Sequence, residues 1–181
     1  MSITHRPAYL ALDLETTHLD PNFGDIVEIA AVVVAADLAE IAHYTSPIAP
    51  APDATWSDFA ATHHAASGLT AEADAARPLA VVLTDLDLWL QAALGDARPY
   101  LFGYSVHFDR AYLTLHAKMF NLPDILRHCS HRHYDVSTLI IEAEALGDMP
   151  SDHTPAPHRA LADCRHALAT ARRLRQQRRL R

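Results

Sequence analysis

The feature that most restricts the fold is an apolar run that leads directly into two closely spaced acids. Residues 8–12 read AYLAL, and Asp13 and Glu15 follow with one residue between them. A short apolar run of this kind predicts a buried strand, in which every second side chain points to the same face. The two carboxylates are therefore expected to converge at the end of that strand.

Converging carboxylates at the end of a buried strand need a partner. Like charges repel one another and each carboxylate loses hydration, and a bound cation relieves both costs. An isolated Asp-x-Glu pair also has a simpler interpretation, since it more often lies in solvent and caps the segment that follows. The choice between the two depends on whether further acids reach the same place.

The rest of the pattern predicts a layered domain. Further strands are expected over residues 26–34, 39–46 and 100–103, the first of which forms a hairpin with the opening strand. Helices are expected over residues 56–94 with a break at Ser67 and Gly68, and over residues 110–120, 135–146 and 158–180, with a loop over 147–157. This order predicts an α/β or α+β domain with a mixed central sheet flanked by helices.

Length and composition predict one compact domain over residues 1–181, because a chain of 181 residues, 50% of them hydrophobic, can bury one full core. Cys129 and Cys164 have neither the number nor the spacing of a disulfide framework or a zinc site, which suits packing residues in a reducing compartment. The best apolar run, residues 26–36, contains Glu28 and is too short to span a membrane. The first residues lack a secretory signal, so we expect a soluble cytoplasmic protein with no membrane contact.

The formal charge of −7 argues against a surface built to bind long nucleic acid, because cationic side chains dominate that affinity. A small anionic substrate, held locally, fits this charge. Six arginines lie within the last ten positions. They are interpreted as the solvated end of a helix, where cations interact favourably with the negative end of the helix dipole. A tail that attracts phosphate is the less favoured interpretation.

Three later residues change the interpretation of the acid pair. Asp109 follows the fourth predicted strand, and His158 and Asp163 lie on the last predicted helix. A separation of five residues places the last two within about 140° of each other around a helix axis. All three can therefore join the first two acids at one rim of the sheet.

The resulting set of side chains suits phosphodiester hydrolysis. The carboxylates of Asp13, Glu15, Asp109 and Asp163 can hold two hard divalent cations, Mg²⁺ or Mn²⁺. One ion orients a hydroxide, and the other stabilises the leaving 3′ oxygen during in-line attack on phosphorus. Imidazoles accept protons near neutral pH, and among 13 histidines His158 is the candidate general base because of its coupling to Asp163.

Three blocks resemble the signature of the DEDDh 3′-to-5′ exonucleases: LDLETT at residues 12–17, GYSVHFD at 103–109 and HRALAD at 158–163. Within that superfamily the chain is similar to the oligoribonucleases. The segments THHAASGL at 62–69 and YDVSTL at 134–139 favour this group over the polymerase proofreading branch. The resemblance implies a ribonuclease-H-like fold, a homodimer, and release of 5′-mononucleotides from very short RNA, as in RNA degradation.

The resemblance also implies substrate-binding roles for five residues. Leu19 would wedge against bases, His64 would line the substrate pocket and Ser105 would bind the terminal phosphate. The simpler alternatives are a core leucine, a buried hydrogen bond and a helix cap. His131 and Arg132 stand where the family has a Tyr-Arg pair that reaches the substrate from the dimer partner. Two further departures are His18, where the family usually has glycine, and Tyr104.

Three alternatives compete with an oligoribonuclease-like enzyme. One is a DEDDh exonuclease with broader RNA or single-stranded DNA substrates, which the acidic net charge disfavours. The second is a nucleotide-binding module whose catalytic residues have decayed, and the third is a structural protein that binds cations at an acidic surface. The second conflicts with the presence of the required residue type at all five catalytic positions, since uncompensated acids are costly to keep together. The third remains as the simplest alternative.

Overall fold

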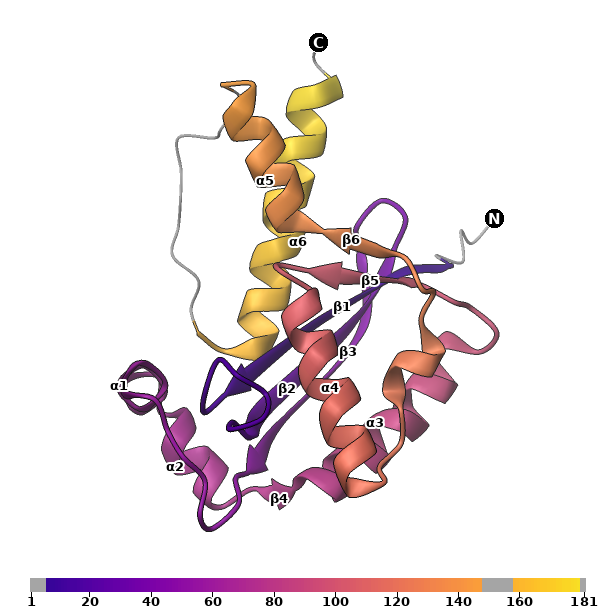
Figure 1. The fold of residues 1–181 in the computed structure, drawn as a ribbon. Coiled ribbons are helices and arrows are strands. Elements are labelled where there is room, and N and C mark those ends of the chain that lie inside the picture. Colours follow the sequence, from indigo (N-terminus) through magenta and orange to yellow (C-terminus); the bar gives the residue numbers. More distant parts are fainter. Residues whose placement is uncertain (1–5, 148–157, 180–181) are drawn as a thin grey trace.

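The protein is built around a mixed six-stranded sheet with the strand order β4-β3-β2-β1-β5-β6 (Figure 1). The structure is a computed structural model and describes residues 6–147 and 158–179. The strands are β1 (Pro7–Thr16), β2 (Ile26–Ala35), β3 (Glu40–Ala49), β4 (Arg77–Pro78), β5 (Tyr100–Gly103) and β6 (His133–Asp135). The first three form an antiparallel meander, whereas β5 runs parallel to β1 and β6 parallel to β5. The predicted mixed sheet is confirmed.

The helices follow the predicted order. They are α1 (Asp58–Ala66), α2 (Leu69–Asp74), α3 (Leu79–Leu94), α4 (His107–Phe120), the 3-10 turn η1 (Ile125–His128), α5 (Val136–Ala145) and α6 (Ala160–Arg179). The break at Ser67 and Gly68 is confirmed, and Gly68 has the positive φ of 78° that glycine adopts without strain. The strands β4 and β6 and the turn η1 were not predicted. The predicted loop over 147–157 lies almost entirely outside the described residues.

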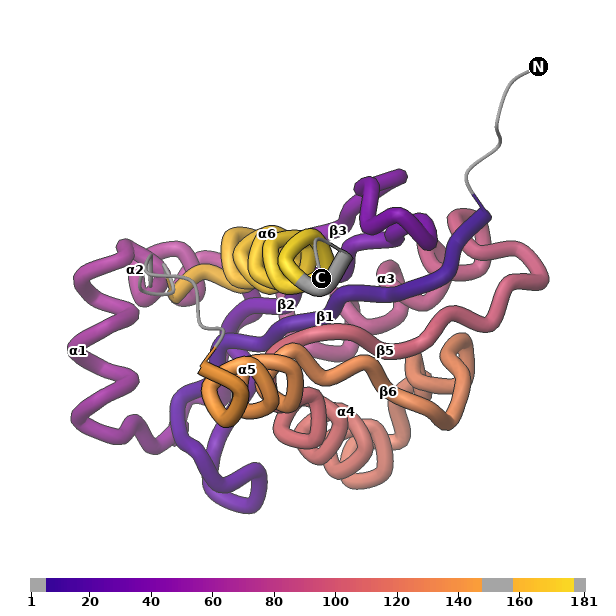
Figure 2. The backbone as a smooth tube through the Cα atoms, turned by 90° about the horizontal axis from the view of Figure 1, so that it is seen from above, coloured from indigo at the N-terminus to yellow at the C-terminus, as the bar shows by residue number. Residues whose placement is uncertain are grey.

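The two faces of β1 carry different side chains, as strand alternation requires. Leu10, Leu12 and Leu14 join a core that includes side chains of α3 and α4. Ala11 faces the opposite way into a second core, to which α6 contributes a row of small and apolar side chains. Seen from above, α6 lies on one side of the strands and α4 on the other (Figure 2).

The strand β2 is buried along all ten of its residues, because it lies inside the sheet with helices packed on both faces. This explains its nearly continuous apolar sequence. Glu28 is the one charged residue of the strand, and only 3% of it is exposed. None of the described helices is long and apolar enough to cross a membrane.

Candidate active site

Three acids meet at the carboxyl end of β1. Asp13 and Glu15 follow Ala11 on the same face of the strand, which is the face that α6 covers. Asp163 lies in the first turn of α6. One ligand atom from each of these three residues lies within 4.8 Å of the other two. The structure thus brings together side chains that the chain holds about 150 positions apart.

Asp109 approaches the same place from the other side of the sheet. The strand β5 ends at Gly103, and its last pairing with β1 is between Phe102 and Ala11. The N–H of Leu14 therefore lies beyond the end of this pairing. That N–H donates a hydrogen bond to Asp109 Oδ1 at 3.0 Å. Asp109 sits in the first turn of α4, and its charge raises the pKa of Asp13. The end of β5 therefore leaves the space in which the fourth carboxylate lies.

The four carboxyl groups resist ionisation in the absence of a cation. Burial, with repulsion from neighbouring acids, raises the pKa of Asp13 well above its ordinary value and that of Glu15 to about 8. Burial likewise raises the pKa of Asp109 to about 8. The pKa of Asp163 is also raised by burial, although the nearby His158 offsets part of the effect. Such a cluster is electrostatically unfavourable unless positive charge joins it.

The donor set fits a hard divalent cation. All the candidate ligand atoms are carboxylate oxygens, which Mg²⁺ and Mn²⁺ prefer. Asp163 Oδ1 is buried and has no hydrogen-bond partner within the described structure. A buried oxygen without a donor is costly, and a cation coordinated at this atom would remove that cost.

A pocket of about 130 Å³ opens beside the acids, and Glu15, Leu19, Phe59, His64 and His158 are among its lining residues. Leu19 is 76% exposed, so the alternative of a core leucine is wrong. Phe59 is also exposed, which leaves its ring accessible at the rim of the pocket. The pocket thus combines a charged wall with apolar surfaces.

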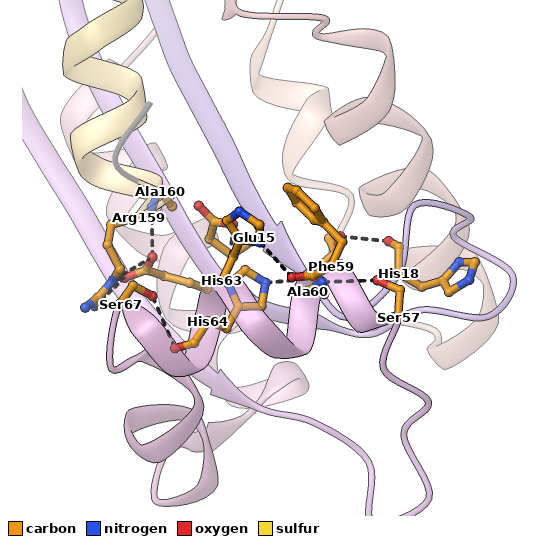
Figure 3. Close-up of polar contacts among 12 residues, drawn as sticks. Glu15, His18, Ser57, Phe59, Ala60, His63, His64, Ser67, Arg159 and Ala160 are labelled. Atoms are coloured by element: carbon orange, nitrogen blue, oxygen red, sulfur yellow. Dashed lines mark hydrogen bonds and ion pairs between the residues drawn. The ribbon is translucent and has the colours of Figure 1, made fainter. Parts of the chain in front are cut away.

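His64 both lines the pocket and makes a buried hydrogen bond. Its Nε2 lies 3.0 Å from the carbonyl oxygen of Thr16, so Nε2 carries the donated proton. Its Nδ1 lies 3.8 Å from Glu15 Oε2 and has no hydrogen-bond partner. Burial lowers the pKa of His64, which favours a neutral ring with a free acceptor at Nδ1. Figure 3 shows His64 next to Glu15.

His158 lies outside α6, contrary to the prediction. The helix begins at Ala160, and His158 has a left-handed backbone with φ 54°. The expected angle between His158 and Asp163 on a common helix is therefore wrong. His158 nevertheless lines the pocket, and its ring centroid is 4.8 Å from that of His63. His63 in turn stacks on Phe59 with centroids 3.8 Å apart.

Ser105 lies apart from the pocket lining. Its N–H donates to Asp135 Oδ1 at 3.2 Å and to Ser137 Oγ at 3.1 Å, and its own hydroxyl lies 3.2 Å from Ser137 Oγ. The alternative of a helix cap is wrong, because α4 has Val106 at its N-cap and no side-chain cap. Ser105 thus joins the end of β5 to the start of α5.

His131 and Arg132 are exposed and directly precede β6. The first residue of β6 is level with Leu101 of β5, which is level with Leu10 of β1. Arg132 is therefore four positions behind Asp13, or about 13 Å along the strand direction at 3.3 Å per residue. Neither residue lines the pocket of its own chain.

Four residues near the acids were not predicted as part of the site: Glu28, Phe59, His63 and Arg159. A signal for Glu28 was present, because it is the one acid in an otherwise apolar buried strand. Arg159 belongs to the HRALAD block but was assigned no role. Phe59 and His63 stack because they are four positions apart on α1, a spacing too common to mark a site.

Comparison with known proteins connects this geometry to a family. The family model RNase_T, described as Exonuclease, matches residues 10–171. The mitochondrial oligoribonuclease of Mus musculus is 31% identical over 164 residues, which cover 84% of this chain and 65% of the mouse protein. The oligoribonuclease of Francisella tularensis subsp. holarctica is 30% identical over 174 residues, which cover 92% of this chain and 93% of that protein.

Solved structures share the fold. The nuclease domain of 3′hExo, a DEDDh family member bound to rAMP, has a TM-score of 0.66 and 19% identity, with 96% of this chain and 94% of that chain covered. Escherichia coli exonuclease I in complex with an oligonucleotide has a TM-score of 0.73 and 18% identity. That comparison covers 97% of this chain and 42% of exonuclease I, so the present chain corresponds to less than half of that enzyme.

Proposed function

Because the chain belongs to the RNase_T family of exonucleases and is similar to oligoribonucleases, we propose that it releases 5′-mononucleotides from short oligoribonucleotides by two-metal-ion hydrolysis. Family membership makes it a metal-dependent 3′-to-5′ exonuclease that acts on nucleic acid. The observation that carries the finer proposal is the buried cluster of carboxylates with raised pKa values beside a small pocket. We further propose one exonuclease domain over residues 1–181 and a cytoplasmic location.

Asp13, Glu15, Asp109 and Asp163 would hold two cations, Mg²⁺ or Mn²⁺. The cations would activate water and stabilise charge on the leaving 3′ oxygen. Their binding would displace the protons that burial keeps on the acids, so the carboxylates would remain ionised during turnover. Asp109 would also keep the end of β1 in place through its hydrogen bond to the N–H of Leu14.

His158 would act as general base. Its ring lines the pocket together with Glu15. From this position the imidazole would take a proton from the attacking water. The oxygen of that water forms a bond to phosphorus while the bond from phosphorus to the 3′ oxygen breaks. General-base catalysis of this kind contributes about 10²- to 10⁴-fold to a rate.

The pocket would hold the 3′-terminal nucleotide. Leu19 would press against a base, and the exposed ring of Phe59 offers a stacking surface. His64 Nδ1 is a free acceptor near Glu15 and could receive a hydrogen bond from a sugar hydroxyl of the substrate. Ribose offers one more such hydroxyl than deoxyribose, which supports an RNA substrate.

Ser105, His131 and Arg132 do not line the pocket of their own chain, so their proposed contacts with substrate need a further condition. Ser105 would bind a terminal phosphate with its hydroxyl, which lies 3.2 Å from Ser137 Oγ. His131 and Arg132 lie away from the pocket of their own chain, so they would contact substrate only from the second subunit of a homodimer. Histidine can stack on a base and arginine can pair with a phosphate.

The competing function is a DEDDh exonuclease with broader RNA or single-stranded DNA substrates. The structural similarity to exonuclease I bound to an oligonucleotide motivates this alternative. The pocket of about 130 Å³ and the formal charge of −7 favour the short substrate.

Cleavage of 5′-labelled RNA from two to about ten nucleotides, with a DNA dinucleotide alongside, separates the two functions. The reactions need Mg²⁺ or Mn²⁺ and a parallel series with a chelator. We expect the RNA dinucleotide to be cleaved fastest. Comparable rates on longer RNA or on DNA would support the broader exonuclease, and absence of metal-dependent cleavage would refute both.

A further inference from the structure

A single arginine joins three elements beside the candidate active site. Glu28 lies directly opposite Glu15 in the pairing of β1 with β2, and its carboxylate accepts hydrogen bonds from Arg159 Nη2 at 2.9 Å and Nε at 3.2 Å. The other edge of the same guanidinium bonds Glu72 of α2, at 3.1 Å from Nη1 and 2.7 Å from Nη2. We call this arrangement of Glu28, Arg159 and Glu72 the arginine bridge.

The bridge also fixes the first residue of α6. The N–H of Ala160 donates to Glu28 Oε2 at 2.8 Å. An acid at this position satisfies an N–H that has no partner within the helix, and it interacts favourably with the positive end of the helix dipole. Figure 3 shows Arg159 and Ala160 close to Glu15, on the side away from His18. The start of the helix is therefore anchored to the buried strand β2.

His158 directly precedes this anchored segment. Its φ of 54° is unusual for a residue other than glycine and costs on the order of 1 kcal/mol, which contacts of the surrounding chain must offset. On its carboxyl side, the conformation is set by Arg159 and Ala160, both of which are hydrogen-bonded to Glu28. The left-handed turn directs the chain so that the ring of His158 lines the pocket.

We propose that Arg159, held by Glu28 and Glu72, is a positioning residue that keeps His158 in place for proton transfer. This inference rests on the proposed function of His158 as general base. A misplacement of the base by about 1 Å can cost about 10²-fold in rate. The bridge therefore affects turnover through His158 without contacting the substrate.

A simpler role for the bridge would be to fasten α6 to the sheet. The chain provides a matched control for that role, because Arg165 makes an equivalent pair with Glu40. Its Nε and Nη2 both lie 3.0 Å from the two carboxylate oxygens. That pair also joins α6 to a strand of the sheet, but it lies on the exposed surface and neither residue lines the pocket.

The test is a double-mutant cycle in the full chain. Single-turnover cleavage of a labelled RNA dinucleotide in Mn²⁺ is measured for the wild type, Arg159→Gln, His158→Ala and the variant with both changes. We expect Arg159→Gln to lower the maximal rate at saturating Mn²⁺ about 10- to 100-fold, with the substrate concentration at half-maximal rate unchanged. In the His158→Ala background the same change should cause little further loss, because its effect passes through His158.

Controls separate positioning from folding. Arg165→Gln should leave the rate unchanged, and Arg159→Lys should lose less activity than Arg159→Gln because it keeps the charge but not the forked geometry. Thermal melts of each variant show whether it is folded at the assay temperature. If Arg159→Gln is poorly folded, the cycle is run with Arg159→Lys.

Two outcomes would contradict the inference in different ways. An equal loss from the Arg159 change in both backgrounds would mean that the bridge acts independently of His158, and would leave the proposed function intact. A wild-type rate for His158→Ala would remove the general base itself, and the positioning role with it.

Discussion

The two ends of β1 differ in how well their polar groups are satisfied, although they lie on the same face of one strand. At the amino end, Tyr9 packs against Tyr134 with centroids 5.3 Å apart, and Arg175 lies over both rings. Arg175 also donates to the hydroxyl oxygens of Tyr9 at 2.9 Å and Tyr134 at 3.0 Å. At the carboxyl end, Asp13 and Glu15 face Asp163 with raised pKa values.

The amino end of β1 therefore serves stability, and the carboxyl end serves the proposed chemistry. The aromatic end uses its polar groups for contacts within the fold, so it contributes stability. The acidic end keeps carboxylates together at a cost in stability, and a cation would recover that cost on binding. Functional sites commonly hold such unfavourable arrangements, and here the two cases can be compared within one element.

The largest expected effect is the loss of activity on neutralising an acid. Asp109→Asn keeps an oxygen that can accept the hydrogen bond from Leu14 but removes a charge that a cation needs. Loss of several kcal/mol of transition-state stabilisation corresponds to about a 10³-fold lower rate. Cleavage of an RNA dinucleotide and titration with Mn²⁺ measure the two consequences. If the variant kept wild-type turnover, Asp109 would have no place in the site.

The next largest effect is the pH dependence of stability that the acidic end should cause. The pKa values of Glu15 and Asp109 are about 8 in the folded protein and near 4 when unfolded. The folded state therefore binds more protons between these values, so the free energy of unfolding of the metal-free protein should fall as pH rises from about 6 to about 8. A decrease of about 2 kcal/mol is expected from each of these two groups.

Thermal or urea unfolding in a chelator at both pH values measures this decrease. Glu15→Gln removes one of the titrating groups and should reduce the dependence on pH. Addition of Mn²⁺ should stabilise the protein more at the higher pH, where fewer protons compete with the cation. A metal-free protein that is more stable at about pH 8 would contradict the view that the acidic end is held at a cost.

A change at the aromatic end should affect stability and leave catalysis intact. Arg175→Ala removes two hydrogen bonds to tyrosine hydroxyls and the cation–π contacts. We expect a loss of about 1–2 kcal/mol in the free energy of unfolding, with the rate of cleavage unchanged. Urea denaturation and the dinucleotide assay together test this. A loss of activity that exceeds the loss of folded protein would show that the two ends are coupled.

The smallest effect concerns a residue at the acidic end that carries no charge. Leu19 is 76% exposed at the rim of the pocket, so Leu19→Ala should leave stability within about 0.5 kcal/mol. Loss of a few methylene contacts with a base is worth about 1–3 kcal/mol, so the substrate concentration at half-maximal rate should rise roughly tenfold. The exposed Leu88 of α3 provides a matched control, because Leu88→Ala should change neither property.

The sequence predicted those parts of the fold that local patterns determine. The bounds of β5 agree with the prediction, as does the break before α2, since an apolar run and a serine-glycine pair report local conformation. The strands β4 and β6 have two and three residues, too few for a periodic pattern. They exist because longer strands beside them offer hydrogen bonds.

The site was predictable to a similar extent. The alternation of β1 indicates that Asp13 and Glu15 share a face, and the structure places them together. The start of α6 could not be read locally, because the acid that caps Ala160 is Glu28, 132 positions earlier. For the same reason the left-handed conformation of His158 was not expected. Long-range pairing decided both features.

The outermost strands of the sheet are too short to pair with another chain over a long stretch. A sheet grows by backbone pairing only where an edge strand presents a run of free amides and carbonyls. At one edge β4 consists of Arg77 and Pro78, and proline has no N–H to donate (Figure 1). At the other edge β6 offers three residues. Sheet growth from either of these two short strands is thereby discouraged, whereas the ten-residue strand β3 pairs with β4 only at Ile48 and Ala49.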